Sequence, residues 1–334
     1  MELYFNASSA ISPLGSFENE PPGLVAPGQT MGYFVSKEPD YKNTIDKKHL
    51  RRMSRFIKMA VANAMNCLTR AGLEQPDAII TGTGLGCVTD TIDFLQQINA
   101  NSETMLNPTG FMQSTHNTAS GQIALLLNCR NFNITFSHKN ISFESALLQA
   151  KMMLNGENYR NILVGGMDEI TPQSFELITQ TSCIRRYAGN HPLIPGEGAA
   201  FFILTNQPSA KNIARFDAMS VFCGKLSEGS FSDLFQHFTD DSHFSTKDVD
   251  LILTGAHPSD EVYGLLSNRF SENPIIGFKD YCGEYDTSTS FALWLALNLI
   301  NKSIDGCYGP SPENVLIHNQ GSGSCHSFIL VSKC

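Results

Sequence analysis

Apolar and polar positions follow two rhythms along this chain, and their order predicts alternating helices and strands. Residues 118–127 and 142–154 have the small-residue and apolar spacing of helices. Residues 132–136 are rich in β-forming side chains, and 162–164 form a short apolar run closed by two glycines, which is typical of a buried strand. The segment 111–169 therefore predicts a helix, a strand, a tight turn, a second helix and a second strand.

The polar turn at residues 137–140 is where chemistry is expected within this segment. A turn held between a strand and a helix points its central side chain into the space above the helix N-terminus. Free backbone N–H groups and the helix dipole favour a nucleophilic anion or an oxyanion in that space.

The same alternation continues on both sides of this segment and predicts an α/β protein in which helices lie between sheets. The predicted strands are residues 3–11, 78–81, 199–204, 217–224, 249–253, 275–278, 315–319 and 326–332. One helix is predicted to end near residue 71. Further helices are predicted at residues 231–239, 260–268 and 288–301.

Composition narrows the class of protein. With 334 residues and 42% hydrophobic content, the chain can bury a large core. No stretch approaches 18 consecutive apolar residues and no secretory signal starts the chain, so we expect a cytoplasmic protein without a membrane span. A net charge of −9 argues against a nucleic-acid binder. Nine cysteines without C-x-x-C pairs predict reduced thiols, with no disulfide framework and no metal site.

Several short motifs resemble those of one known family. The segment 111–169 matches its nucleophile region, and residues 2–16 match its opening strand and "SPLG" loop. Further matches are RRMSR at 51–55, GTGLG at 82–86, GEGAA at 196–200, and GSGS at 321–324. Together they resemble the β-ketoacyl synthases, condensing enzymes of the thiolase superfamily. The resemblance implies a five-layer αβαβα sandwich with two pseudo-equivalent halves, residues 1–205 and 206–334.

The resemblance also implies which chemistry is lost. The family's nucleophilic cysteine, which a helix N-terminus activates as a thiolate, corresponds to Lys139, with His138 beside it. The first family histidine corresponds to Gly255, and His257 follows two residues later. The second sits in a K-x-x-x-G-H pattern, which here ends in Glu284. All three positions have changed, so no catalytic residue is expected.

A ketosynthase-like chain without this Cys-His-His set resembles a chain-length factor, the pseudo-enzyme that pairs with an active ketosynthase and shapes its product tunnel. The elbow region looks most like subunits of aryl-polyene and flexirubin-type pathways. We therefore expect a homo- or heterodimer, an acyl carrier protein partner, and no cofactor except the carrier's phosphopantetheine. The resemblance implies tunnel residues Phe111, Met112, Gln113 and Thr115, a small Ser322 in place of the gating phenylalanine, and carrier docking at Lys48, Arg51 and Arg52.

Other interpretations stay open at this point. The basic run at 47–58 is also explained as a solvated helix face. The fold could retain another reaction, such as acyl transfer or decarboxylation of malonyl carrier protein, with Lys139 and Glu284 as acid and base. The same two side chains could instead form a salt bridge that fills the pocket. A free-standing homodimeric acyl-binding protein is a third possibility.

Overall fold

A ten-stranded mixed sheet organises the structure, a computed structural model that describes residues 1–17, 23–28, 32–156, 158–180, 194–224, 227–242, 245–301, 304, 310–321 and 325–334. The strand order is β3-β2-β4-β5-β1-β6-β10-β9-β7-β8. The strands are β1 (Leu3–Ile11), β2 (Ala78–Gly82), β3 (Phe132–Phe136), β4 (Asn161–Asp168), β5 (Gly198–Thr205), β6 (Ala214–Cys223), β7 (Leu251–Thr254), β8 (Ile275–Gly277), β9 (Asn314–Gln320) and β10 (Cys325–Ser332).

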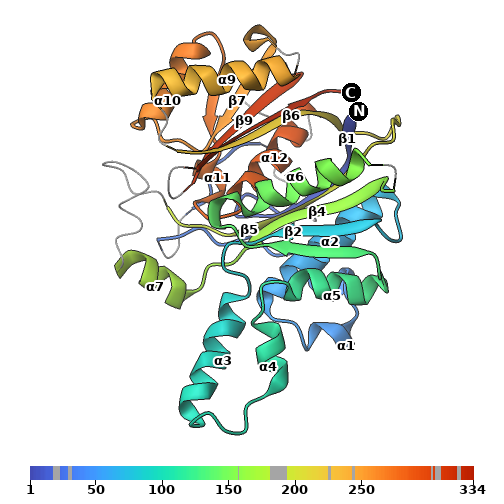
Figure 1. The fold of residues 1–334 in the computed structure, drawn as a ribbon. Coiled ribbons are helices and arrows are strands. Elements are labelled where there is room, and N and C mark those ends of the chain that lie inside the picture. The colour runs from blue at the N-terminus through green and yellow to red at the C-terminus, as the bar shows by residue number, and fades with distance from the viewer. Residues whose placement is uncertain are drawn as a thin grey trace.

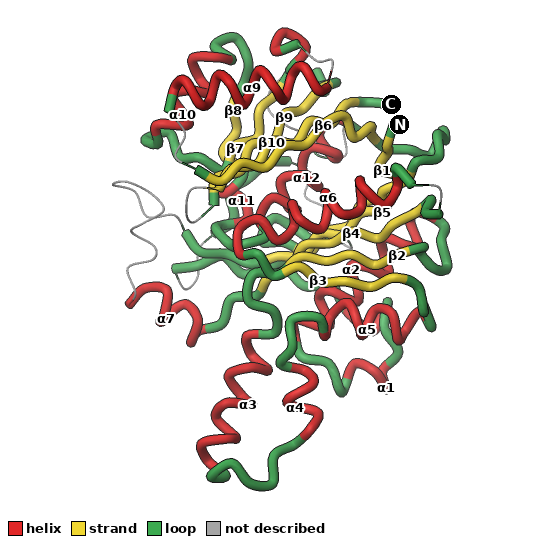
Figure 2. The backbone as a smooth tube through the Cα atoms, in the orientation of Figure 1, coloured by secondary structure: helices red, strands yellow, loops and turns green. Residues whose placement is uncertain are grey.

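The sheet divides into two halves that face each other across a layer of helices (Figures 1 and 2). Strands β1 and β6 connect the halves, and they pair only near Leu3, Tyr4 and Phe5. Helices α6 (Ser142–Leu154) and α12 (Ser288–Ile300) lie between the halves. Helix α12 is apolar on almost every side, and all of its residues are buried, as expected for a helix enclosed by protein.

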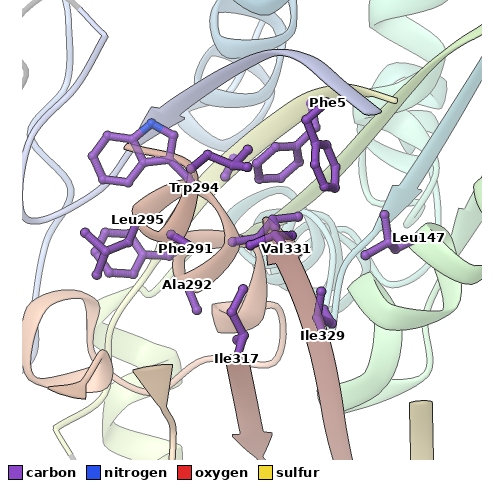
Figure 3. Close-up of a cluster of buried hydrophobic side chains, with 14 of the residues drawn as sticks. Phe5, Leu147, Phe291, Ala292, Trp294, Leu295, Ile317, Ile329 and Val331 are labelled. Atoms are coloured by element: carbon purple, nitrogen blue, oxygen red, sulfur yellow. The ribbon is translucent and has the colours of Figure 1, made fainter. Parts of the chain in front are cut away.

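The central hydrophobic cluster contains side chains from both halves. Figure 3 shows Trp294 and Phe291 of α12 beside Ile317 of β9, Val331 of β10 and Phe5 of β1. Because strands from each half contribute to this one cluster, the halves share a core. The predicted boundary at residues 205 and 206 falls in the connection between β5 and β6. The division into two pseudo-equivalent halves stays a prediction.

Outer helices cover the remaining faces of the sheet and complete the predicted five layers (Figure 1). Helices α2 and α5 bury one cluster against the first half, and α9 and α10 bury a phenylalanine-rich cluster against the second. The other helices are α1 (Lys47–Leu50), α2 (Arg55–Ala71), α3 (Val88–Ala100), α4 (Pro108–Gln113), α5 (Thr118–Leu127), α7 (Pro172–Gln180), α9 (Glu228–Ser242), α10 (Glu261–Arg269) and α11 (Lys279–Cys282), with 3-10 turns η1 (Tyr41–Asn43), η2 (Lys139–Ile141) and η3 (Thr246–Asp248).

An ion pair between a half-buried arginine and a buried glutamate joins two of the sequence motifs. Arg55, at the start of α2, donates two hydrogen bonds to the carboxylate of Glu197, at 2.6 and 2.5 Å. The backbone N–H groups of Ser36 and Ile170 also donate to Glu197, which is fully buried. These motif residues therefore fasten α2 to the strand that follows Glu197.

Helices α3 and α4 form an arm that projects from the body (Figures 1 and 2). Neither helix has a buried residue. The rings of Phe94 in α3 and Phe111 in α4 contact each other, with centroids 5.8 Å apart. Exposed apolar side chains on the arm include Leu95, Met105 and Met112.

Two outcomes bear on predictions made from composition. The prediction of reduced thiols is wrong for one pair, because Cys223 and Cys325 form a disulfide. The register of β6 and β10 places these two residues opposite each other although 102 positions separate them along the chain. No helix among the described residues is long and apolar enough to cross a bilayer.

Candidate functional site

Lys139 occupies the turn between β3 and α6, where the sequence predicted a reactive position. Its φ of 55° is in the left-handed region, which non-glycine residues rarely adopt. The Ser142 hydroxyl donates to the carbonyl of Lys139 at 2.6 Å and accepts from the N–H of His138 at 2.8 Å. One buried serine therefore holds this turn in its sharp conformation, while the side chains of His138 and Lys139 are exposed.

A glycine lets the turn lie close to the sheet. A Cβ atom added at Gly82, the last residue of β2, would stand 2.6 Å from the backbone nitrogen of Phe143 in α6. The start of α6 can therefore approach the strand end only because position 82 has no side chain.

The buried ion pair of Lys279 and Glu284 forms the floor of the site. The two charged groups lie 2.5 Å apart, and their side chains are 3% and 13% exposed. The ammonium also donates to the carbonyl of Gln320 at 2.7 Å. Glu284 is the position that the resemblance matched to the second family histidine, and its carboxylate is paired with an ammonium here.

Gly255 has no side chain, and Lys279 and Asn319 fill the space beside it. A Cβ atom at Gly255 would lie 2.8 Å from Cε of Lys279 and would overlap the amide oxygen of Asn319. The space beside Gly255, which the resemblance matched to the first family histidine, is therefore occupied by parts of two other side chains. The hypothesis that Glu284 pairs with Lys139 is wrong, because Glu284 forms its ion pair with Lys279.

A second pair of carboxylates lies beside this floor. Asp168 accepts hydrogen bonds from the N–H of Gly84 at 2.7 Å and from the N–H and hydroxyl of Thr287 at 2.9 and 2.8 Å. Asp286 lies against Gly84, where an added Cβ atom would overlap its carboxylate. The two aspartates therefore meet at the end of β2 with Gly84 between them.

Burial sets the protonation of these acids. Burial and the charge of Asp286 raise the pKa of Asp168 to about 7. Burial likewise raises the pKa of Asp286, although the ammonium groups of Lys139 and Lys279 oppose that rise. Burial raises the pKa of Glu284, and Lys279 opposes this rise. These acids and the nearby amines therefore form one electrostatic network, in which burial favours the neutral acids and the ammonium groups favour the carboxylates.

Two histidines next to the network stay uncharged. His318 is buried, and its Nδ1 lies 3.0 Å from the hydroxyl of Thr254. Its Nε2 lies 3.4 Å from Nδ1 of His326. Burial lowers the pKa of His326 to about 4 and that of His318 well below its usual value.

No described cysteine can replace the missing nucleophile. Cys282 is the cysteine closest in sequence to Glu284, and burial raises the pKa of its thiol well above the usual value. A thiol must ionise to attack a thioester, so Cys282 is unreactive. The described residues also contain no group of His, Cys, Asp and Glu side chains that could hold a metal ion.

A cavity of about 230 Å³ opens beside the floor, at the carboxyl ends of β7 and β8. It is lined by side chains that include His257, Tyr263, Lys279 and Tyr281, together with the backbone of Gly255. His257 therefore borders this cavity, and its Nδ1 lies 2.8 Å from the hydroxyl of Ser259.

The remaining predicted residues lie away from the floor. Phe111 and Met112 are exposed on α4 of the arm, and the amide of Gln113 donates to the carbonyl of Arg52 at 2.6 Å. The hydroxyl of Thr115 donates to the carbonyl of Met112. Lys48, Arg51 and Arg52 are exposed together at α1. Ser322 lies outside the described residues.

Sequence reasoning did not identify Lys279, Asn319, Asp168 or Asp286 as parts of the site. Lys279 had one signal, because it opens the K-x-x-x-G pattern that ends at Glu284. The two aspartates and Asn319 had no such signal, because strand ends far apart in the sequence bring them together.

Comparisons with known proteins place these observations in context. The family model described as "Beta-ketoacyl synthase, N-terminal domain" matches residues 35–219. A search of curated protein sequences found no match.

Solved structures resemble the whole chain. A β-ketoacyl synthase from Burkholderia phymatum STM815 matches with a TM-score of 0.81 and 14% identity, over 100% of this chain and 99% of that chain. The ishigamide ketosynthase/chain length factor matches with a TM-score of 0.78 and 15% identity, over 100% of this chain and 99% of that chain. The ketosynthase ApeO in complex with its chain length factor ApeC, from Xenorhabdus doucetiae, matches with a TM-score of 0.72 and 14% identity. This match covers 100% of this chain and 98% of that chain. These likenesses confirm the predicted thiolase-like α/β fold.

Proposed function

Because this chain belongs to the β-ketoacyl synthase family, we propose that it is a non-catalytic subunit of the chain-length-factor type, which pairs with an active β-ketoacyl synthase. Its substrates would be acyl chains carried on the phosphopantetheine of an acyl carrier protein, in a cytoplasmic type II polyketide, aryl-polyene or fatty-acid-like pathway. The chain itself would hold no cofactor.

The observation that carries this proposal is the filled floor of the site. Lys279 and Glu284 neutralise each other, and they and Asn319 occupy the space at Gly255. A condensing enzyme must stabilise an enolate by donating hydrogen bonds to it. The Glu284 carboxylate only accepts hydrogen bonds while it is ionised, and the ammonium of Lys279 is paired with Glu284 and donates to the carbonyl of Gln320. The two charged groups of the floor therefore neutralise each other, which supports a non-catalytic role.

The turn above the floor supports the same conclusion. The position above α6 would suit an anion, but Lys139 brings a cation there. An amine that attacked a thioester would form a stable amide, which would block turnover and not support it. The other enzymatic interpretation, with Lys139 and Glu284 as acid and base, loses its support because Glu284 is bound to Lys279.

The edge of the first half-sheet supports pairing with another subunit. Strand β3 ends the strand order, and it pairs with β2 on one side only among the described strands. Exposed apolar side chains flank this edge: Leu125 on α5, Phe132 on β3, and Leu148 and Met152 on α6. An open edge bordered by apolar groups is a surface that proteins normally cover.

The projecting arm extends this surface. Helices α3 and α4 bury no residue in the single chain, and isolated short helices are only marginally stable in water. Contact with a partner would bury Phe111 and Met112, the side chains for which we propose a role in lining the acyl tunnel. The exposed Lys48, Arg51 and Arg52 would bind the acidic carrier protein.

Co-expression with an intact ketosynthase encoded by a neighbouring gene tests this function. We expect a one-to-one complex by native mass measurement, and condensation of malonyl and acyl carrier protein only when both chains are present. Lys139→Ala should leave that activity unchanged. A matched pair of surface variants, Leu148→Asp at the β3 edge and Leu177→Asp on α7, should separate pairing from general effects: only the first should weaken the complex.

Two results would contradict the proposal. A stable homodimer that turns over carrier-bound substrate alone, and loses this activity with Lys139→Ala or Glu284→Gln, would show an enzyme. A homodimer that binds acyl chains without turnover and ignores the ketosynthase would show a free-standing acyl-binding protein.

A further inference from the structure

The disulfide between Cys223 and Cys325 lies at one end of the paired strands that border the site. Cys223 is the last residue of β6, and Cys325 is the first residue of β10. The two residues face each other in the antiparallel register of these strands. Cys223 is exposed and Cys325 is half-buried, so a reagent in solution can reach the disulfide through Cys223.

Cys325 is connected to the site through very few bonds. The N–H of Gly321 donates to the carbonyl of Cys325 at 3.4 Å. The next residue, His326, pairs with Gln320 at the end of β9. The carbonyl of Gln320 in turn accepts the hydrogen bond from Lys279. The disulfide therefore holds the start of β10, and the adjacent end of β9 contributes the Gln320 carbonyl that binds Lys279 of the buried ion pair.

A second route leads from the same strand to the turn at Lys139. Gly321 packs so closely on Asn140 that an added Cβ atom would overlap the Asn140 amide. The hydroxyl of Ser327, two residues after Cys325, donates to the carboxylate of Glu144 at 2.9 Å. Glu144 is fully buried in the first turn of α6. Both the turn and the floor of the site thus contact the strand end that the disulfide holds.

We propose that Cys223 and Cys325 form a thiol–disulfide exchange site that controls how firmly the β9–β10 end is held against the site. A small dithiol or a dithiol protein is the reductant. Its thiolate attacks Sγ of Cys223, the S–S bond breaks, and Cys325 leaves as a thiolate that takes up a proton. The second thiol of the reductant then displaces Cys223, so that two protein thiols and one oxidised dithiol result.

Apart from the exposed Cys334 at the end of the chain, the other described cysteines are buried, so this pair is the accessible disulfide among the described residues. Cys67, Cys87, Cys129 and Cys282 are buried, and burial raises the pKa of the Cys67 and Cys87 thiols. Exposed disulfides exchange more readily than buried ones, and disulfides in reducing compartments are usually transient or redox-sensing. Reduction removes a crosslink between positions 102 residues apart, so that the start of β10 is held by its pairing with β6 and β9 alone.

The purified full-length chain, oxidised and reduced, tests this site without any partner. Peptide mapping of the oxidised chain should recover one crosslinked peptide that contains both Cys223 and Cys325, and a small dithiol should open it under native conditions. Hydrogen exchange should then rise at residues 314–321 and 137–145 by roughly tenfold or more, which is within the loss of stability expected when a crosslink over a long loop is opened. Cys223→Ser should exchange like the reduced chain under both conditions, whereas Cys334→Ser, at the exposed C-terminal cysteine, should behave like the parent.

Three results would overturn the proposal. The oxidised chain could contain no link between these cysteines. The link could resist the dithiol until the protein unfolds. Exchange at both segments could be equal in the oxidised and reduced parent chain, a comparison that needs no variant to fold.

Discussion

The ammonium of Lys279 is almost entirely removed from water, so its ion pair with Glu284 differs in energy from an ion pair at the surface. Moving both charges out of water is costly, and their attraction offsets this cost only while both partners are present. The pair of Lys48 and Asp46 is the contrast, since its groups lie 3.9 Å apart with side chains 73% and 60% exposed. Exposed pairs of this kind contribute little.

Replacing Lys279 by methionine should therefore destabilise the chain strongly. Lys279→Met leaves Glu284 buried without a cation, which typically costs about 3–5 kcal/mol. Because the pKa of Glu284 is already raised by burial, the carboxyl can protonate at low pH, so the loss should grow as the pH rises. Denaturant unfolding of the variant at several pH values measures this loss.

Two further variants serve as controls for that measurement. The double variant Lys279→Met/Glu284→Gln should recover much of the stability, because no unpaired charge remains. Lys48→Met should change the unfolding free energy by no more than about 0.5 kcal/mol. A single Lys279→Met variant as stable as the parent would show that the pair is solvated in solution.

Asp168 and Asp286 should give the chain a measurable pH dependence of stability. The pKa of Asp168 is about 7 in the folded chain and 3.8 as its ordinary value. A raised acid pKa means that the folded state binds the proton more tightly than the unfolded state. Its contribution is therefore complete below about pH 4 and is lost as the pH rises to about 7, at no more than about 1.4 kcal/mol per pH unit.

Asp286→Asn should flatten this decline. The substitution removes the neighbouring charge that raises the pKa of Asp168, although the effect of burial remains. Unfolding midpoints of parent and variant between pH 4 and 8 provide the measurement. A variant whose stability falls as steeply as that of the parent would show that the two carboxylates do not interact.

At the scale of elements, the sequence predicted what hydrophobic burial determines and missed what it does not. Helices α5 and α6 and strand β3 have the predicted bounds, because each has a face or an edge packed in the body. Helix α3 was not predicted, although its apolar residues Val88, Ile92 and Leu95 have helical spacing. None of these side chains is buried in this chain.

The same reasoning explains the site. Positions 139, 255 and 284 could be singled out from motif spacing, since each motif is continuous in the sequence. The side chains that pack on Gly255 could not be predicted, because Lys279 and Asn319 reach it from the connection after β8 and from β9. The disulfide was missed for a similar reason: only the register of β6 and β10 brings its cysteines together.

For the whole molecule, one core joins both halves of the chain. The central cluster includes Phe5 and Leu147 from the first half and Trp294 and Ile329 from the second (Figure 3). A core shared in this way favours unfolding in one cooperative step, with both halves losing structure together.

Trp294→Ala tests this cooperation. The side chain is 2% exposed, so its removal should cost about 3–5 kcal/mol. We expect a single unfolding transition with the same midpoint for probes placed in residues 1–205 and in 206–334. Leu125→Ala, at a side chain that is 73% exposed, should change little. Two separate transitions would show that the halves are independent folding units.

The packing around Gly255 also restricts how this protein could change over evolutionary time. A side chain at position 255 would collide with Lys279 and Asn319, and Lys279 cannot be lost while Glu284 stays buried beside it. Each single substitution toward a histidine-bearing site therefore passes through a protein less stable than the present one. Natural proteins have little stability to spare, so such intermediates would be removed by selection. The packing of the floor thus makes a histidine at position 255 or 284 hard to acquire through single substitutions.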